Sequence, residues 1–218
     1  MATFGVSTET LSDHALLVDG DTTGGPGLIL AHGAGAAMDS EFMNVVCQGL
    51  AGQGVKVFRF EFPYMAERRE TGKRKLPSPQ SRLLQTWREV IDQVGSAERL
   101  VIGGKSMGGR MASLLADEIG VRGLVCLGYP FHPSGKPEQL RTAHLQQVTT
   151  PTLIVQGERD SLGSRVDVSG YGIDPGIRFV WMPDGDHSFK PRVKSGRTLE
   201  ENLAVCVETV ARFVCGLS

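Results

Sequence analysis

Short apolar runs alternate with segments of helical periodicity along almost the whole sequence. The runs are rich in β-branched residues and nearly continuous, which is typical of strands buried on both faces of a parallel sheet. We expect strands over 27–31, 55–62, 100–103, 123–127, 152–155 and 177–182. A chain with this alternation predicts a doubly wound α/β fold, with a mostly parallel sheet and helices on both faces.

Helix start signals stand ahead of three of the periodic segments, and one or two further strands are expected near the N-terminus. Residues 1–20 predict one or two antiparallel strands, with 14–19 the better candidate. Asp39 is a candidate N-cap residue. Ser78 is a second candidate N-cap residue and is followed by Pro79 at the first helical position. Thr198 and Glu201 have the spacing of a capping box.

The length of the chain bounds the number of domains. A domain holds roughly 100–200 residues, so we expect one α/β domain over residues 1–218. Two stretches interrupt the alternation, a polar connection over 63–80 and a glycine-rich one over 161–176. Neither is long enough for a separate lid domain, and both leave strand ends, where open α/β sheets bind ligands.

A glycine-rich pentapeptide carries the strongest functional signal. Residues 104–108, Gly-Lys-Ser-Met-Gly, fit the G-x-S-x-G pattern and stand directly between an apolar run and a helical segment. This context predicts a nucleophilic Ser106 on a tight turn. A phosphate-binding loop is excluded, because it needs a glycine where the chain has Arg99. Lys105 and Arg110 flank the serine, and we expect them to pair with nearby acids.

The residues that could activate Ser106 follow it along the chain. A serine nucleophile needs a histidine base and a carboxylate that orients the histidine, and in this architecture they follow in the order acid, then histidine. Asp160 and His187 each come just after one of the last two apolar runs. We therefore expect Ser106, Asp160 and His187 to meet at neighbouring strand ends, with Asp184 and Asp186 as alternative acids.

The segment 32–36, His-Gly-Ala-Gly-Ala, follows the first of the central runs. Its small residues let the backbone approach a substrate carbonyl closely, as an oxyanion hole requires. We expect the two N–H donors to belong to Met107 and Ala34, with Gly35 or Ala36 as alternatives to Ala34. His32 is expected to anchor this loop by hydrogen bonds rather than to act as a second base.

Positive charge gathers in the segment 68–75. We expect this segment either to be a solvated loop or to recognise an anionic group of the substrate, such as a carboxylate or phosphate. Nucleic acid is disfavoured as a partner, because the segment has no interleaved aromatic residues and the whole chain carries 23 basic against 24 acidic side chains. The candidate substrate-binding cations are Arg68, Arg69 and Lys73.

The cysteines and the apolar stretches indicate the cellular compartment in which we expect the protein. None of the four cysteines forms a C-x-x-C pair, and Cys206 and Cys215 stand nine residues apart in one helical segment, too far for a disulfide. No stretch reaches the ~18 apolar residues of a membrane-spanning helix. The N-terminal residues also lack the pattern of a secretory signal. We therefore expect reduced thiols, no membrane partner and a cytoplasmic location.

Four motifs together resemble the α/β-hydrolase superfamily over essentially the whole chain. They are HGAG at 32–35, FPYM at 62–65, GKSMGGR at 104–110 and GERD at 157–160. Within the superfamily they are similar to the lidless dienelactone-hydrolase-like branch, and more narrowly to testis-expressed-30-like proteins. Dienelactone hydrolases proper carry a cysteine where this chain has Ser106, so lactone specificity is not implied. The resemblance implies an acyl-transfer hydrolase that needs no metal or organic cofactor.

Two functions from different classes fit these observations. The first is a serine hydrolase for a small ester or thioester, in which Ser106 attacks the carbonyl, His187 takes the proton and Asp160 orients the imidazole. Without a lid, long-chain triglycerides are disfavoured as substrates, whereas short peptides stay open. The second is a binding or scaffold protein that keeps the fold without turnover, since a fold does not fix a function.

Overall fold

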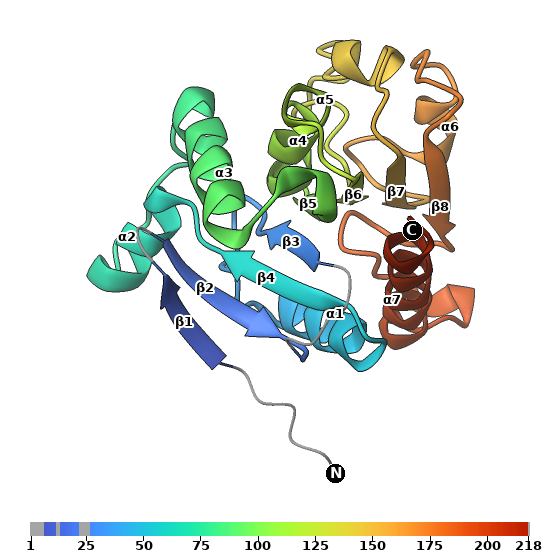
Figure 1. Ribbon diagram of the computed structural model, residues 1–218. Helices are drawn as coiled ribbons and strands as arrows, with labels where there is room; N and C mark the ends of the chain where they lie inside the picture. Colours follow the sequence, from blue (N-terminus) through green and yellow to red (C-terminus); the bar gives the residue numbers. More distant parts are fainter. Residues whose placement is uncertain (1–6, 12–13, 22–26, 218) are drawn as a thin grey trace.

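A single twisted sheet of eight strands runs through the described part of the chain, residues 7–11, 14–21 and 27–217 (Figure 1). In this computed structural model the strand order is β1-β2-β4-β3-β5-β6-β7-β8. Strands β3 to β8 are parallel, and β1 and β2 form an antiparallel edge on β4. The strands span Ser7–Leu11 (β1), His14–Asp19 (β2), Gly27–Ala31 (β3), Lys56–Phe60 (β4), Leu100–Lys105 (β5), Gly123–Leu127 (β6), Thr152–Gly157 (β7) and Arg178–Met182 (β8).

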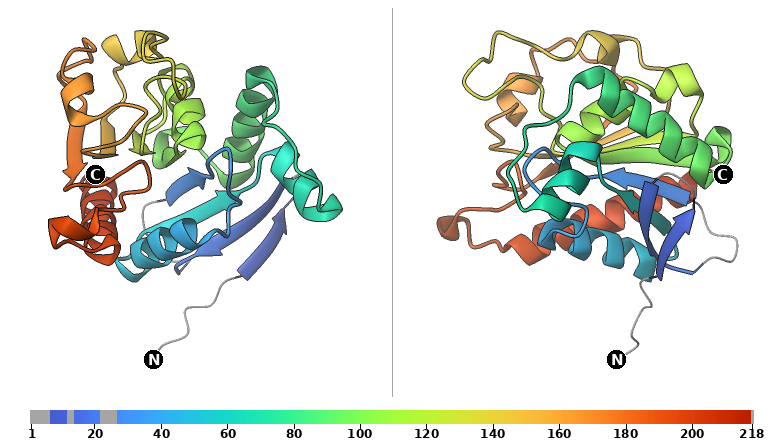
Figure 2. Two further views of the ribbon diagram at one scale, coloured as in Figure 1. Left: turned by 180° about the vertical axis from the view of Figure 1, so that it is seen from behind. Right: turned by 90° about the vertical axis from the view of Figure 1, so that its left-hand side faces the viewer.

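Helices cover both faces of this sheet. Helices α1 and α7 lie against one face, and α3 and α4 lie against the other (Figures 1 and 2). The helices span Glu41–Gly52 (α1), Pro63–Thr71 (α2), Gln80–Val94 (α3), Met107–Ser113 (α4), Ala116–Ile119 (α5), Arg165–Val168 (α6) and Leu199–Gly216 (α7). Three 3₁₀ turns at Ala97–Arg99, Ala143–Gln146 and Val193–Ser195 complete the regular structure of the described residues.

The continuous apolar runs reflect a core on each side of the sheet. Val101 of β5 packs in the cluster under α1 and α7, and the next residue, Ile102, packs in the cluster under α3 and α4. Successive strand residues point to opposite faces, so a strand covered on both faces needs an apolar residue at every position. Trp87 of α3 is fully buried over one face, and Val210 of α7 is fully buried over the other. Each such side chain contributes roughly 1.5–3 kcal/mol by leaving water.

Helix α2 corrects the expectation of a loop over 63–80. Pro63 occupies the first helical turn, where its fixed φ and missing N–H cost nothing. Gly72 ends the helix in the left-handed conformation, with φ 68°, and its N–H bonds to the carbonyl of Arg68. Only Tyr64 and Met65 of α2 are buried, so the apolar periodicity that usually reveals a helix is weak here. The stretch 161–176 likewise holds the short helix α6.

The helix start signals were correct for one helix of three. Thr198 and Glu201 form the predicted capping box at α7, with the Glu201 N–H donating to the Thr198 hydroxyl at 3.1 Å. Helix α1 begins after Ser40, without a side-chain cap, and Asp39 accepts hydrogen bonds from an arginine of α2 instead. Pro79 is itself the N-cap residue of α3, so Ser78 lies outside that helix. Of the one or two antiparallel strands expected within 1–20, the structure has two, over 7–11 and 14–19. The rest of that range lies mostly outside the described residues.

Candidate active site

Ser106 lies on a sharp turn between β5 and α4. Its backbone has φ 51° and ψ −115°, a conformation that is strained for any residue with a side chain. The Ser106 N–H donates to the carbonyl of Leu127 at 3.0 Å, and the Arg110 N–H donates to the carbonyl of Ser106 at 3.0 Å. These bonds hold the turn, which places the serine hydroxyl at the carboxyl end of β5.

Gly108 lets the start of α4 lie against the neighbouring strand. A Cβ atom at this position would lie 2.6 Å from the carbonyl oxygens of both Ala31 and His32. These oxygens belong to backbone that cannot move without disturbing β3 and the loop that follows it. The glycine therefore fixes the distance between the serine turn and the segment 32–36.

His187 joins Ser106 and Asp160 through the two nitrogens of its ring. Its Nε2 lies 2.8 Å from Oγ of Ser106, and its Nδ1 lies 2.7 Å from Oδ2 of Asp160. A carboxylate accepts hydrogen bonds, so Nδ1 carries the proton and Nε2 offers its lone pair to the serine hydroxyl. The structure thus brings together the three residues expected to meet, in an arrangement that lets the imidazole accept the hydroxyl proton.

Asp160 is fully buried, and its carboxylate is satisfied by hydrogen bonds from the protein. Oδ2 accepts from Nε2 of Gln156 at 2.8 Å as well as from His187, and Oδ1 accepts from the N–H of Leu162 at 2.8 Å. Gln156 is itself held in place, because its Oε1 accepts from the N–H of Tyr129 at 2.7 Å. The sequence gives no sign of this role for Gln156, whose amide fixes the orientation of the carboxylate that faces His187.

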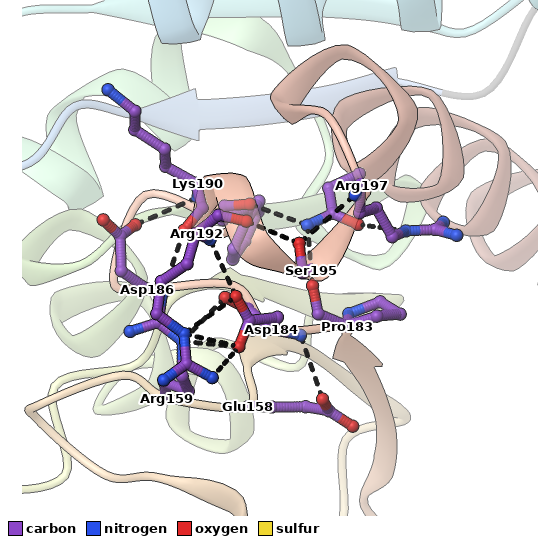
Figure 3. A network of polar contacts seen from close by, with 11 residues as sticks. Glu158, Arg159, Pro183, Asp184, Asp186, Lys190, Arg192, Ser195 and Arg197 are labelled. Atoms are coloured by element: carbon purple, nitrogen blue, oxygen red, sulfur yellow. Dashed lines mark hydrogen bonds and ion pairs between the residues drawn. The ribbon is translucent and has the colours of Figure 1, made fainter.

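The two alternative acids belong to a separate network in the loop that carries His187 (Figure 3). The carboxylate of Asp184 pairs with Arg192, which donates from Nε at 2.9 Å, and with Arg159 at 3.0 Å. The hydrogen bonds from Arg192 hold the pKa of Asp184 well below its usual range. Asp186 accepts from the N–H of Lys190 at 3.0 Å. Both carboxylates brace the loop, and Asp160 is the one that contacts His187.

His32 fixes the loop that follows β3, as expected from the sequence. The N–H of Phe62 donates to Nε2 of His32 at 3.1 Å, so Nδ1 carries the proton and donates to the carbonyl of Gly33 at 2.7 Å. Burial lowers the pKa of His32, which keeps the ring neutral. The hydroxyl of Tyr64 donates to the carbonyl of Ala34 at 3.1 Å. The predicted anchoring role of His32 is confirmed.

A pocket of about 440 Å³ opens beside the serine turn. Ser106 lines it together with Ala34 and Met107, the residues expected to supply the oxyanion hole. Its other walls come from the connection before α3, from α4 and from the segments after β6 and β7. These residues are Pro77, Ser78, Gln80, Leu83, Arg110, Met111, Pro130, His132, Pro133, Ser134, Arg141 and Leu162. His132, Arg110 and Arg141 were not predicted to lie here, because no local pattern shows which loops meet at this edge.

Among the described residues, neither Lys105 nor Arg110 forms an ion pair with an acid, which corrects a sequence expectation. Nζ of Lys105 donates to the carbonyl of His187 at 2.8 Å and lies 5.6 Å from the ring centroid of Phe42. Lys105 is buried, and desolvation lowers the pKa of its ammonium to about 8. Nη2 of Arg110 donates to Oε1 of Gln80 at 3.2 Å.

The basic segment does not contribute to this pocket. The guanidinium of Arg69 pairs with Glu61 at 2.7 Å and with Asp39 at 2.8 Å, which joins α2 to the start of α1. Arg68 and Arg69 line a different hollow of about 360 Å³ with residues 35–37. Lys73 lies in neither lining. The predicted substrate-binding cations Arg68, Arg69 and Lys73 thus do not line the pocket beside Ser106, and Arg69 braces α2.

Metal-site and membrane signals are absent from the described residues. Within 7–11, 14–21 and 27–217, no group of three or more His, Cys, Asp or Glu side chains could hold a metal ion. No helix of the same residues is both long and apolar enough to cross a bilayer. Cys47, Cys126 and Cys206 are buried free thiols, and Cys215 is an exposed one.

A comparison with known families decides which protein class this is. A family model described as alpha/beta hydrolase domain matches residues 25–215. The chain belongs to the alpha/beta hydrolase family. The hydrolase has the α/β architecture without a separate lid domain that the strand–helix alternation predicts, and that prediction is confirmed.

Solved structures share the fold of this hydrolase at low identity. A serine hydrolase homologue from Coxiella burnetii superposes with a TM-score of 0.69 at 18% identity, covering 96% of this chain and 99% of that one. A serine hydrolase without lid from Xanthomonas campestris gives 0.65 at 19%, covering 97% and 95%. A dienelactone hydrolase from Anabaena variabilis gives 0.65 at 18%, covering 97% and 96%. At these identities the likeness shows the fold alone.

Proposed function

We propose that this hydrolase cleaves small esters or thioesters through an acyl-enzyme formed on Ser106. The observation that carries the proposal is the unbroken hydrogen-bonded path from Asp160 through His187 to Ser106, with distances of 2.7 and 2.8 Å. The path ends at the pocket, where Ser106 meets the loop of small residues that includes Ala34. Nucleophile, base and orienting acid at such distances are the geometry of acyl transfer.

The chemistry follows from the positions of these groups. Oγ of Ser106 attacks the acyl carbonyl carbon while Nε2 of His187 takes the hydroxyl proton, and Asp160 stabilises the imidazolium that forms. The N–H groups of Met107 and Ala34 bind the oxyanion. His187 then gives the proton to the departing alcohol or thiol. A water molecule, deprotonated by the same nitrogen, attacks the acyl-enzyme and releases the acid.

The size of the pocket supports a small substrate. About 440 Å³ lies at the lower end of the ~300–1,000 Å³ typical of small-molecule sites. We place the hydrolase in the lidless dienelactone-hydrolase-like branch, close to testis-expressed-30-like proteins, on its motifs at 32–35, 62–65, 104–110 and 157–160. We assign it to the cytoplasm, with a small acyl substrate as its partner and neither nucleic acid nor a membrane.

A fluorophosphonate probe and p-nitrophenyl acetate test this proposal. The wild type becomes covalently labelled and releases p-nitrophenol, and Ser106→Ala loses both activities while its thermal unfolding stays close to that of the wild type. Ser169→Ala is the matched control, because Ser169 is exposed and its hydroxyl donates to the carbonyl of Val166 in the preceding turn. A wild type without labelling or turnover would favour a binding protein, and labelled Ser106→Ala would place the nucleophile elsewhere.

A further inference from the structure

The charge inside the pocket beside Ser106 is of one sign. Arg110 and Arg141 are among the residues that line it, and none of the described residues that line it is acidic. Some arginines elsewhere do pair with acids: Arg59 pairs with Asp19 at 2.8 Å, and Arg192 pairs with Asp184. Among the described residues, neither arginine of the pocket has a carboxylate partner.

Arg110 lies one helical turn after the nucleophile. Its N–H bonds to the carbonyl of Ser106, which ties the position of its side chain to the serine turn. Its guanidinium makes one hydrogen bond, to the neutral amide of Gln80 at 3.2 Å, and its Nε is buried without a partner. Burial lowers the pKa of Arg110, and the charge of Arg141 lowers it further. This cation is thus partly dehydrated and in the field of a second one.

Arg141 is held at the pocket by its backbone. Its N–H donates to the carbonyl of Phe131 at 2.7 Å, and the hydroxyl of Tyr129 donates to its carbonyl at 2.9 Å. Tyr129 and Phe131 are both fully buried, so this part of the segment after β6 is firmly packed. Within the described ranges, the guanidinium of Arg141 contacts no carboxylate. The fold thus holds its backbone fixed and leaves its donors open.

Two neighbouring guanidinium groups repel each other and lose hydration when partly buried, and an anion between them offsets both effects. The planar fork of arginine matches a carboxylate by two parallel hydrogen bonds. From this arrangement we propose that the substrate ester carries a carboxylate, which Arg110 and Arg141 bind while Ser106 attacks the ester carbonyl. This inference rests on the proposed function for the reaction, but the anion site itself does not require turnover.

The size of the pocket limits the length of the substrate. Ser106, Arg110 and Arg141 line the same pocket of about 440 Å³, so a molecule that reaches all three is small. A half-ester of a short linear dicarboxylic acid carries its carboxylate a few methylene groups away from the ester carbonyl. The apolar lining from Leu83, Met111 and Leu162 suits the methylene groups between them.

The kinetic test compares two p-nitrophenyl esters whose distal carboxylate is free in one and methylated in the other. They are p-nitrophenyl monoadipate and its methyl ester, and the quantity measured is the ratio of their kcat/KM values. We expect a ratio of roughly ten to one hundred in favour of the carboxylate for the wild type, the range of a charge-assisted hydrogen bond. Arg141→Gln brings the ratio close to one, Arg141→Lys leaves it intermediate, and Arg212→Gln, an exposed arginine on α7, leaves it unchanged.

A binding measurement separates this inference from the proposed reaction. Calorimetry of adipate with Ser106→Ala needs no turnover, and we expect binding that Arg141→Gln added to Ser106→Ala abolishes. If neutral esters are hydrolysed through Ser106 but the wild-type ratio is near one, the anion site is wrong and the hydrolase stands. If no ester is hydrolysed but adipate binds through Arg141, the reaction is wrong and the anion site stands. Adipate binding that survives Arg141→Gln overturns the assignment.

Discussion

The ammonium of Lys105 donates a hydrogen bond of 2.8 Å to the backbone carbonyl of His187. The residue before the proposed nucleophile therefore holds the loop that carries the proposed base, across 82 positions of sequence. This bond joins the end of β5 to the segment after β8. The distance between Ser106 and His187 consequently depends on a buried cation that does not itself face the pocket.

The stability of the hydrolase should depend on the protonation of Lys105. Burial lowers the pKa of this ammonium from 10.5 to about 8, so between those pH values the unfolded chain holds a proton that the folded chain has released. Stability rises with pH wherever the unfolded state binds more protons. We expect the free energy of unfolding of the wild type, relative to Lys105→Met, to rise from about pH 8 to about pH 10.5. Urea unfolding at several pH values measures this difference, and a difference independent of pH would contradict the burial of the charge.

Removal of the charge of Asp160 should cost far more activity than removal of the charge of Asp184. Asp160→Asn takes away the acceptor that fixes the His187 tautomer, so kcat on p-nitrophenyl acetate should fall by up to ~10⁴. Asp184→Asn loosens only the contacts with Arg192 and Arg159, and its kcat should stay within about tenfold of the wild type. A larger loss of kcat in Asp184→Asn than in Asp160→Asn would assign the carboxylate that orients His187 to Asp184.

His32→Ala should damage both stability and turnover. The change leaves the N–H of Phe62 buried without its partner and takes from the carbonyl of Gly33 its shorter hydrogen bond, which costs about 1–3 kcal/mol. The released loop no longer holds the Ala34 N–H in place, so kcat should fall by roughly 10², with a smaller change in KM. His14→Ala is the control, since His14 of β2 bonds to Glu89 of α3 and not to this loop. A His32→Ala variant with lowered stability and normal kcat would show that His32 does not position the oxyanion hole.

Gly108→Ala tests the close approach of α4 to β3. The added methyl group meets two carbonyl oxygens at 2.6 Å, and relief of this overlap should lower the free energy of unfolding by about 1–3 kcal/mol. Gly52→Ala at the end of α1 adds the same atom where no other heavy atom lies within 4 Å. That variant should be neutral or up to ~1 kcal/mol more stable. Equal thermal unfolding of the two variants would show that the turn tolerates a side chain.

Arg69→Gln distinguishes the two interpretations of the basic segment. Arg69 is the partner of Glu61, which is 8% exposed, so its loss should lower the free energy of unfolding by about 1 kcal/mol. Because the segment lies outside the pocket, the preference for p-nitrophenyl monoadipate over its methyl ester should match that of the wild type. A preference that falls in Arg69→Gln, and not in Arg212→Gln, would restore the segment as a substrate-binding element.

The sequence predicted those site residues that directly follow the ends of strands. Ser106, Asp160 and His187 each come after an apolar run, and a parallel sheet brings the carboxyl ends of such runs to one edge. Their meeting could therefore be predicted from chain order. The partners Gln156 and Lys105 could not, because each acts through a contact made in the folded state that leaves no local pattern. Helix α2 was missed for a different reason: it buries too few residues to show a periodicity, although Pro63 and Gly72 mark its ends.

The wall of the pocket and the proposed reacting groups come from different kinds of chain segment. Ser106, Asp160 and His187 follow the ends of β5, β7 and β8, whereas residues 77–80 and 130–141 reach the pocket from segments outside the sheet. Exchange of these segments leaves the strand pairing, and so the spacing of serine and histidine, intact. Replacement of these two surface segments can thus change the substrate preference of this hydrolase, in evolution or by design. The positions of Ser106, Asp160 and His187, and with them the proposed reaction, stay the same.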